Sequence, residues 1–365
     1  MSHSVEDNSF EEHRADGLMR RALKLTEGTQ PHPNPRVGAL VLAPNGDVVS
    51  ERAHLAPGTA HAEAAALAEA GPAAAGSTLV VTLEPCVHHG RTPPCTEAII
   101  EAGVERVIVG ALDPDPRVSG RGVAALEEAG IEVIAGVAEG AVRANDPAYF
   151  HHRLTGLPLV TLKIAATLDG QVAAADQTSR WITGPEARED GHRLRAESDA
   201  VMVGAGTVIS DNPRLDVRID GYEGHQPRPV IVAGRRPLPP NSALLSRKPL
   251  VLTGQVVQTG LEGIEQVSLP GTAGVDLAAA MQHLGDRGVL ALLIEGGPTI
   301  GGTAVRAGLV DRVVLHYGAK LAGGRGFPAL DGVFETLTDA RAVTIESVSK
   351  LGRDLRVEAT IERVP

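Results

Sequence analysis

The stretch HAEAAAL at residues 61–67, followed by TLEPCVHHGRTPPC at residues 82–95, determines the fold of the first half of the chain. The alanine-rich segment that starts at His61 predicts a helix, with Gly71 as its end. TLVVTL at residues 78–83 predicts a short buried strand that ends just before Cys86. We therefore expect an open α/β layer with its site at strand ends and at the start of a helix.

The same stretch contains the donors of a hydrolytic zinc site. His61, Cys86 and Cys95 offer one nitrogen and two sulfur ligands, which suit zinc and leave a fourth position open for water. Glu63 lies two residues after His61. A carboxylate there can take the proton from a zinc-activated water and pass it to a leaving amine.

Two structural alternatives compete with this interpretation. The only two cysteines of the chain lie close together, so a disulfide between them is an alternative to metal binding. A closed, purely structural zinc site would need a fourth protein ligand, for which His88 and His89 are the candidates. The presence of His61, Glu63 and Pro85 in the same pattern favours an open metal site over both.

Composition limits the class of protein. A chain of 365 residues with 43% hydrophobic residues is long enough for two domains, and with 2% aromatic residues their cores must consist of aliphatic side chains. The net charge of -11 argues against a partner such as nucleic acid or an anionic membrane. Because the sequence has no apolar run of about 18 residues and begins with a polar segment, we expect a cytoplasmic protein.

Alternation of helix and strand patterns continues through the chain. In the first half we expect a helix at residues 11–25, a hairpin around the turn at residues 44–47, and further alternation to residue 137. We place the domain boundary at about residue 147, which gives a domain at 1–146 and another at 147–365. In the second half, strand and helix patterns alternate from residue 159 to residue 320.

A glycine-rich turn in the second half could bind a cofactor. EGGPTIGG at residues 295–302 follows a predicted strand and opens a predicted helix, so its backbone N–H groups could surround a phosphate, although a tight packing turn has the same pattern. VGAGTV at residues 203–208 lacks the third glycine of the dinucleotide fingerprint. A standard Rossmann domain is therefore not indicated.

The first half resembles a known family. HPNPRVGALV (32–41), ALDPDP (111–116) and GRG (120–122), together with the two stretches above, resemble the N-terminal half of the bifunctional riboflavin-biosynthesis deaminase-reductase, a zinc-dependent nucleobase deaminase. The eight residues between the cysteines favour this family over deaminases with Cys-x-x-Cys. The resemblance implies a cytidine-deaminase-like three-layer domain. It also implies zinc ligation by His61, Cys86 and Cys95, a proton shuttle at Glu63, and substrate contacts at Asn34, His88 and Arg91.

The second half resembles the reductase of the same family, which has a dihydrofolate-reductase-like α/β fold. The motifs are LKIAATLDG (162–170), SRWITG (179–184), LRAESDAVMVGAGTVISDNPRLDVR (194–218) and IEGGPTIGGTAVRAGLVD (294–311). The implied substrate contacts are Ser179, Arg195, Leu215, Arg218 and Glu295. The implied NADPH contacts are Ala165, Trp181, Thr207, Asp211, Gly234, Gly297, Pro298, Thr299, Ile300, Gly301, Gly302 and Thr303.

The resemblance implies two successive reactions. The first is hydrolytic deamination of 2,5-diamino-6-(5-phosphoribosylamino)pyrimidin-4(3H)-one, and the second is NADPH-dependent reduction of the product's ribosyl group to ribityl. Lys163, Asp211 and Glu295 are the candidate proton donors for ring opening. The family commonly has Asn where this chain has Asp115, and often Asp where it has Ala233.

We also expect a homo-oligomer, a dimer or a tetramer. Two other functions are compatible with parts of the sequence: a deaminase of another base or nucleoside fused to an unrelated reductase, and a non-catalytic module that binds metal and nucleotide.

Overall fold

The computed structural model describes residues 3–89, 93–234, 236–254, 261–271, 274–332 and 334–362, with side chains from residue 13 onward. The chain divides into two compact units, Met1–Thr155 and Gly156–Pro365, which we describe separately. Helix α6 (Pro147–Thr155) lies at the end of the first unit. The assignment of the two activities to residues 1–146 and 147–365 remains a proposal.

The first unit is built on a mixed sheet. Within its described residues the sheet has five strands in the order β2-β1-β3-β4-β5. Strand β1 pairs antiparallel with β2 and β3, whereas β3, β4 and β5 run parallel. The strands are β1 (Gly38–Leu42), β2 (Val48–Ala53), β3 (Thr78–Leu83), β4 (Arg106–Ala111) and β5 (Glu132–Ala135).

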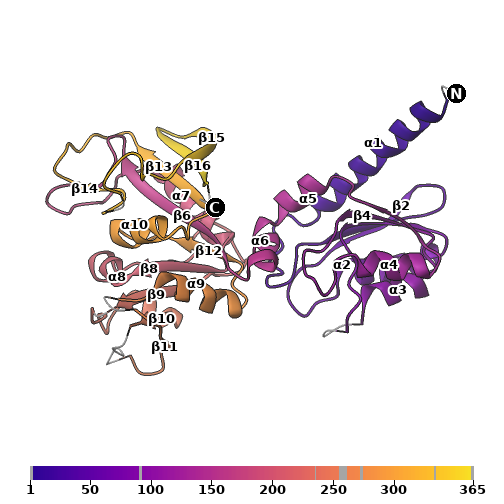
Figure 1. Ribbon diagram of the computed structural model, residues 1–365, viewed down its shortest axis with the longest axis horizontal. Helices are drawn as coiled ribbons and strands as arrows, with labels where there is room; N and C mark the ends of the chain where they lie inside the picture. The colour runs from indigo at the N-terminus through magenta and orange to yellow at the C-terminus, as the bar shows by residue number, and fades with distance from the viewer. Residues whose placement is uncertain are drawn as a thin grey trace. The chain divides into compact units, whose positions relative to one another are not determined.

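Helices cover both faces of this sheet (Figure 1). Helices α2 (Ala62–Ala70), α3 (Cys95–Glu101) and α4 (Arg121–Glu128) pack on one face, and α1 (His3–Lys24) and α5 (Glu139–Asn145) pack on the other. A short 3-10 turn, η1 (Gly71–Ala74), follows α2. The arrangement confirms the expected three-layer, cytidine-deaminase-like domain.

Local sequence explains where these elements begin and end. Strand β1 is buried along its whole length, which matches its sequence GALVL. Helix α2 ends at Gly71, whose positive φ of 52° is readily adopted by glycine, as predicted. At Gly38 a Cβ atom would lie 2.0 Å from the carbonyl oxygen of Ala22, so only glycine lets α1 pack this closely against β1.

The second unit contains a larger sheet. In its described part the sheet has nine strands in the order β11-β10-β9-β8-β12-β6-β13-β16-β15. The strands from β11 to β13 are parallel, and β16 and β15 add an antiparallel hairpin at one edge. Their bounds are β6 (Leu159–Thr167), β8 (Ala200–Gly204), β9 (Arg228–Gly234), β10 (Leu250–Thr253), β11 (Gln266–Ser268), β12 (Ala291–Ile294), β13 (Arg312–Gly318), β15 (Val343–Leu351) and β16 (Asp354–Ile361).

Two aliphatic cores lie on opposite faces of this sheet. One contains side chains of α9 (Leu277–Asp286) and α10 (Pro298–Arg306) packed on the sheet. The other contains side chains of α7 (Pro185–Ala196), α8 (Ala205–Asp211) and η2 (Ala243–Arg247). Strands β7 (Gln171–Ala173) and β14 (Phe327–Pro328) form a small separate sheet. This is the expected dihydrofolate-reductase-like α/β domain.

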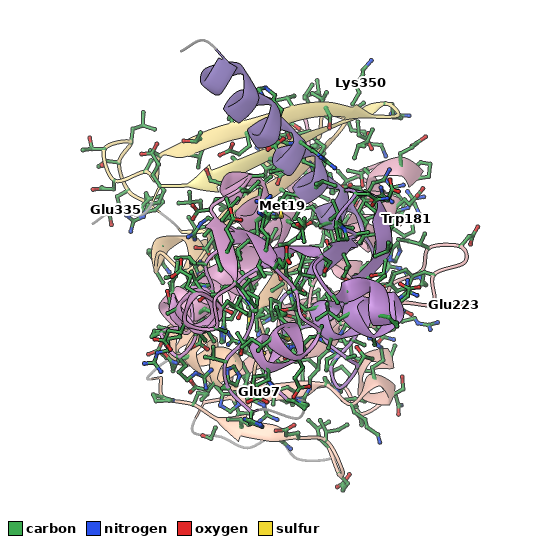
Figure 2. All side chains as sticks on the ribbon, turned by 90° about the vertical axis from the view of Figure 1, so that its right-hand side faces the viewer. Met19, Glu97, Trp181, Glu223, Glu335 and Lys350 are labelled. Carbon is green, nitrogen blue, oxygen red and sulfur yellow. The ribbon has the colours of Figure 1, made fainter. Side chains whose placement is uncertain are left out.

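The β15–β16 hairpin lies after residue 320, where no element was predicted. Figure 2 shows it as an extended ribbon with Lys350 near its tip. Strand β15 is exposed along nearly its whole length, including Val343, Ile345 and Val348. Among the described residues, no helix is both long and apolar enough to cross a membrane.

Candidate functional site

The first unit brings the three predicted metal ligands together. The imidazole of His61 and the thiols of Cys86 and Cys95 offer ligand atoms that all lie within 4.8 Å of one another. The His61 Nδ1 atom lies 3.2 Å from Cys95 Sγ and 3.7 Å from Cys86 Sγ. Among the described residues no fourth His, Cys, Asp or Glu joins this group, so it has the composition of an open site.

Three different elements position these ligands. His61 is the N-cap of α2, Cys86 follows the end of β3, and Cys95 is the first residue of α3. The backbone N–H of Cys95 donates to Cys86 Sγ at 3.3 Å. Both cysteines are free, which excludes the disulfide alternative in this structure. A hydrogen bond from the Cys95 thiol lowers the pKa of Cys86 and raises that of Cys95.

Glu63 is buried beside this cluster, only 3% exposed. Its Oε2 atom has no hydrogen-bond partner among the described residues. Burial, followed by the nearby Cys86 sulfur, raises the pKa of Glu63 to about 7. A hydrogen bond with Cys86 raises the pKa of His61. A buried carboxylate with an unsatisfied oxygen next to a metal-binding cluster has the properties of a proton carrier.

The cluster opens into a cavity of about 550 Å³. Asn34, His54, Glu63, His88 and Arg117 are among the residues that line it. The His54 ring donates from Nδ1 to the carbonyl oxygen of Ala60 at 3.1 Å, and its Nε2 accepts from Asn34 Nδ2 at 3.1 Å. Because the Asn34 amide nitrogen Nδ2 donates to His54, the amide oxygen Oδ1 of Asn34 is the atom that can accept a hydrogen bond from a ligand.

Other buried groups fix the Asn34 loop. The Asp146 carboxylate accepts the backbone N–H of Arg36 at 2.9 Å and contacts His32 Nε2 at 3.1 Å. Burial lowers the pKa of His54, which is 2% exposed and packs edge-on against the His61 ring. The loop therefore presents Asn34 in a defined orientation beside the metal-binding cluster.

Glu84 connects the end of β3 to the region between β4 and α4. Its carboxylate is 4% exposed and accepts four backbone N–H groups from the β4–α4 region. The donors are Asp113 (3.1 Å), Gly120 (3.0 Å), Gly122 (2.8 Å) and Val123 (3.2 Å). The end of β3, which delivers Cys86, is thereby attached to the loop on the other side of the cavity.

The other residues of the first unit that were predicted to contact metal or substrate lie in different places. His88 lines the cavity, whereas the exposed His89 pairs with Glu97 at 3.8 Å on the surface. Arg91 lies outside the described residues. Sequence reasoning missed Tyr149 and Arg153 of α6, which also line the cavity. The Tyr149 hydroxyl donates to Asp113 at 3.0 Å, a contact between distant residues that no local pattern could have indicated.

The second unit has a half-buried charged cluster formed by Lys163, Arg195 and Glu295. Arg195 donates to both carboxylate oxygens of Glu295, from Nε at 2.5 Å and from Nη2 at 2.8 Å. Burial would raise the pKa of Glu295, but Arg195 and Lys163 outweigh it and lower the pKa to about 2. Burial lowers the pKa of Lys163, with Glu295 opposing the shift. Glu295 is therefore held in its ionised form beside Arg195.

The other predicted substrate contacts lie around Asp216. Arg214 and Arg218 both form ion pairs with the Asp216 carboxylate, and Arg195 Nη1 donates to its carbonyl oxygen at 3.1 Å. Leu215 is buried with a positive φ of 54°. Ser179 is half-buried. The three arginines are therefore partly neutralised by carboxylates.

The glycine-rich turn and Thr207 meet at the ends of adjacent parallel strands. Strand β12 leads through Gly297 into α10, and its neighbour β8 leads into α8, which carries Thr207 in its first turn. A Cβ atom on Gly297 would lie 3.7 Å from Thr207 Oγ1. Helices α8 and α10 belong to opposite faces of the sheet. A crevice at such a point is where open α/β sheets bind ligands.

The other predicted cofactor residues lie on several elements. Trp181, labelled in Figure 2, is 61% exposed, and the Arg188 guanidinium lies 4.6 Å from its ring centre. Ala165 lies on β6, Gly234 ends β9, and Asp211 ends α8. Pro298, Thr299, Ile300, Gly301, Gly302 and Thr303 form the first turns of α10. Ala233, where the family often has Asp, is buried in the core on β9.

The two units together define a zinc-dependent deaminase joined to an NADPH-dependent reductase. Residues 12–111 match the cytidine and deoxycytidylate deaminase zinc-binding region, and residues 158–357 match the RibD C-terminal domain. The chain belongs to the RibD family of bifunctional riboflavin-biosynthesis enzymes. The match of the second half excludes an unrelated reductase, and the chain is an enzyme rather than a binding module.

Relatives match along nearly the whole chain. The riboflavin biosynthesis protein RibD of Escherichia coli is 36% identical over 92% of this chain and 96% of its own length. The RibD protein of Aquifex aeolicus is 38% identical over 92% and 96%, respectively. The solved structure of Acinetobacter baumannii RibD (form 2) superposes with a TM-score of 0.89 at 32% identity, covering 96% of this chain and 100% of that one.

Proposed function

We propose that His61, Cys86 and Cys95 hold the zinc ion of the deaminase and that Glu63 moves the proton in the reaction. The observation that carries the proposal is the three-ligand cluster beside the buried Glu63 in one cavity. Two sulfur donors and one imidazole are the ligand chemistry that zinc prefers. The Glu63 Oε2 atom, buried without a partner among the described residues, has the orientation freedom that a proton carrier needs.

The residues of the cavity would divide the work of deamination. Zinc, when bound, acidifies a water molecule so that it can attack the pyrimidine near neutral pH. Glu63 would accept the proton at Oε2 and donate it to the departing amine, which leaves as ammonia. Asn34, held by His54, would accept a hydrogen bond at Oδ1 from the ring edge and orient the base. The substrate would be 2,5-diamino-6-(5-phosphoribosylamino)pyrimidin-4(3H)-one.

For the reductase we propose that Lys163 donates the proton that opens the ribose ring. Of the three candidates, Glu295 is held as a carboxylate by Arg195, and Asp211 lies at the end of α8 with its side chain accepting from Ser210 at 3.0 Å. Lys163 is the remaining candidate: burial lowers its pKa, and the neighbouring Glu295 carboxylate favours its protonated form. Glu295 would hold its ammonium group in place.

We propose that NADPH binds where the first turns of α8 and α10 meet. The backbone N–H groups of the Gly297–Thr303 turn and the Thr207 hydroxyl would bind its phosphates and ribose. NADPH supplies the hydride that C1' of the sugar receives. Ser179, Arg195, Leu215 and Arg218 would contact the substrate, as the family resemblance implies, with His88 and Arg91 contacting it in the first unit.

Assembly and location complete the proposal. We propose a dimer or tetramer, which the exposed apolar side chains of the edge strand β15 support. We also propose a cytoplasmic location, which the use of both cysteines as reduced metal ligands supports. Light scattering on the purified protein tests the first of these proposals, because a mass equal to one chain at micromolar concentration would refute it.

The decisive test of the site residues compares His61→Ala, Cys86→Ser and Cys95→Ser with the parent protein. Each variant should lose bound zinc and ammonia release and keep NADPH oxidation with the deaminated intermediate. His89 pairs with Glu97 on the surface, outside the cluster. His89→Ala is therefore the matched control, and it should keep bound zinc, ammonia release and NADPH oxidation. Full zinc content in any of the three ligand variants would refute the assignment.

A further inference from the structure

The loop between β4 and α4 carries an ion pair at the edge of the deaminase cavity. Asp115 is 7% exposed and Arg117 lies two residues further on, with its side chain 77% exposed. The Asp115 carboxylate accepts from Arg117 Nε at 3.0 Å and from Nη2 at 2.5 Å, and also from the Arg117 backbone N–H at 2.9 Å. Both residues line the cavity.

Asp115 cannot turn away from the cavity, because the loop is held at several points. Its backbone N–H donates to Asp113 Oδ1 at 2.8 Å, and Asp113 in turn is held by Glu84 and Tyr149. A fixed carboxylate at this position would repel a phosphorylated substrate. The negative charge must therefore be compensated locally if the cavity is to accept a phosphate.

The positive charge of Arg117 compensates the Asp115 carboxylate, and part of its guanidinium can still donate hydrogen bonds. Its guanidinium contacts Asp115 through Nε and Nη2, whereas Nη1 has no hydrogen bond to any described residue. A guanidinium has five N–H groups in a planar fork, a geometry that matches phosphate oxygens. A second arginine, Arg153 of α6, lines the same cavity and is fixed by a hydrogen bond from Nη2 to the carbonyl oxygen of Pro33 at 3.0 Å.

We propose that Asp115 and Arg117 act as one recognition unit, in which Asp115 holds the guanidinium at the mouth of the cavity and Arg117 binds the phosphate of the substrate. Asp115 is then a positioning residue and Arg117 a binding residue. This inference rests on the proposed deaminase function and extends it to the phosphate of the substrate.

The test measures ammonia release from two substrates, the phosphoribosyl pyrimidine and its dephosphorylated ribosyl form. Arg117→Gln should raise the KM for the phosphorylated substrate roughly ten- to hundredfold, the effect of losing a hydrogen bond between charged groups. Its kcat and its kinetics on the dephosphorylated form should stay as in the parent. Arg117→Lys should fall between the parent and Arg117→Gln.

A second substitution separates recognition from simple neutralisation. Asp115→Asn in the Arg117→Gln background removes the uncompensated carboxylate but not the loss of the phosphate contact, so it should recover only part of the lost affinity for the phosphorylated substrate. The control is Arg106→Gln, which breaks an ion pair with Glu132 elsewhere on the sheet. This variant should keep the parent KM for both substrates.

Four results would overturn the proposal. Equal KM changes for both substrates would show that Arg117 only maintains the loop. An unchanged KM in Arg117→Gln would show that Arg117 does not contact the substrate. A double variant with the parent KM would show that Arg117 only neutralises Asp115, and one no better than Arg117→Gln would show that the Asp115 charge has no part in recognition. Failure of the proposed function is distinguishable from these results, because the parent protein itself would then release no ammonia from either substrate.

Discussion

Replacing Glu84 with glutamine should loosen the connection between the two sides of the deaminase cavity. Its carboxylate accepts N–H groups of Asp113 and Gly120 at Oε2, and of Gly122 and Val123 at Oε1. A glutamine side chain has nearly the same shape but only one acceptor oxygen. Whichever way its amide points, two buried backbone N–H groups face an NH2 group in place of an oxygen.

The size of the effect follows from those two lost hydrogen bonds. A buried donor left without a partner costs about 1–3 kcal/mol, so Glu84→Gln should lower the free energy of unfolding of the first unit by about 2–6 kcal/mol. For a unit of this size each kcal/mol corresponds to about 2–4 °C in Tm. We therefore expect the thermal transition of the first unit to fall by roughly 5–20 °C.

Scanning calorimetry of the full chain measures this shift, and hydrogen exchange at residues 113–123 locates it. The transition of the second unit should stay in place. Glu128→Gln, on the exposed surface of α4, is the matched control and should change neither readout. A Tm within a degree of this control, with unchanged exchange at the amides of Gly120, Gly122 and Val123, would refute the reasoning.

Three further predictions concern the charged and metal-binding groups. Cys86→Ser should abolish bound zinc and ammonia release, with no effect on reduction of the deaminated intermediate; metal analysis showing zinc at the parent level would contradict it. Glu295→Gln leaves Arg195 buried without its partner and should destabilise the second unit by about 3–5 kcal/mol in urea unfolding. Because folding lowers the pKa of Glu295 to about 2, the parent has this stabilisation above the unfolded pKa of about 4.3 and loses it as pH falls toward 2, whereas the variant should lack that acid dependence. Lys163→Met should lower the rate of NADPH oxidation about 10²–10⁴-fold with NADPH affinity retained, and a smaller loss would exclude it as the proton donor.

The sequence was sufficient to predict what short-range patterns encode. The helix after His61, the buried strand TLVVTL and the glycine-rich turn before α10 all form where their patterns indicate. The metal-binding cluster could be predicted because its residues occur at spacings typical of one chemistry. Alternating buried strands and helices likewise identified two α/β units.

Contacts between residues distant in the sequence could not be predicted. Glu84 contacts backbone groups 29 to 39 residues further along the chain, and Arg195 pairs with Glu295, 100 residues away. The β15–β16 hairpin was missed because β15 is exposed along nearly its whole length and so lacks the alternation of a half-buried strand. The contribution of α6 to the deaminase cavity depends on the folded unit, since Tyr149 and Arg153 have no motif of their own.

If one chain carries two active sites and Glu63 serves only the first, a single substitution should separate the two activities. The zinc-loaded full chain receives the diaminopyrimidine substrate and NADPH, and ammonia and NADPH are followed separately in the parent and in Glu63→Gln. We expect both signals in the parent and neither in Glu63→Gln. NADPH oxidation should return when this variant receives the deaminated intermediate. Ammonia release at the parent rate in Glu63→Gln, or failure of the intermediate to restore NADPH oxidation, would show that the two sites are not divided in this way.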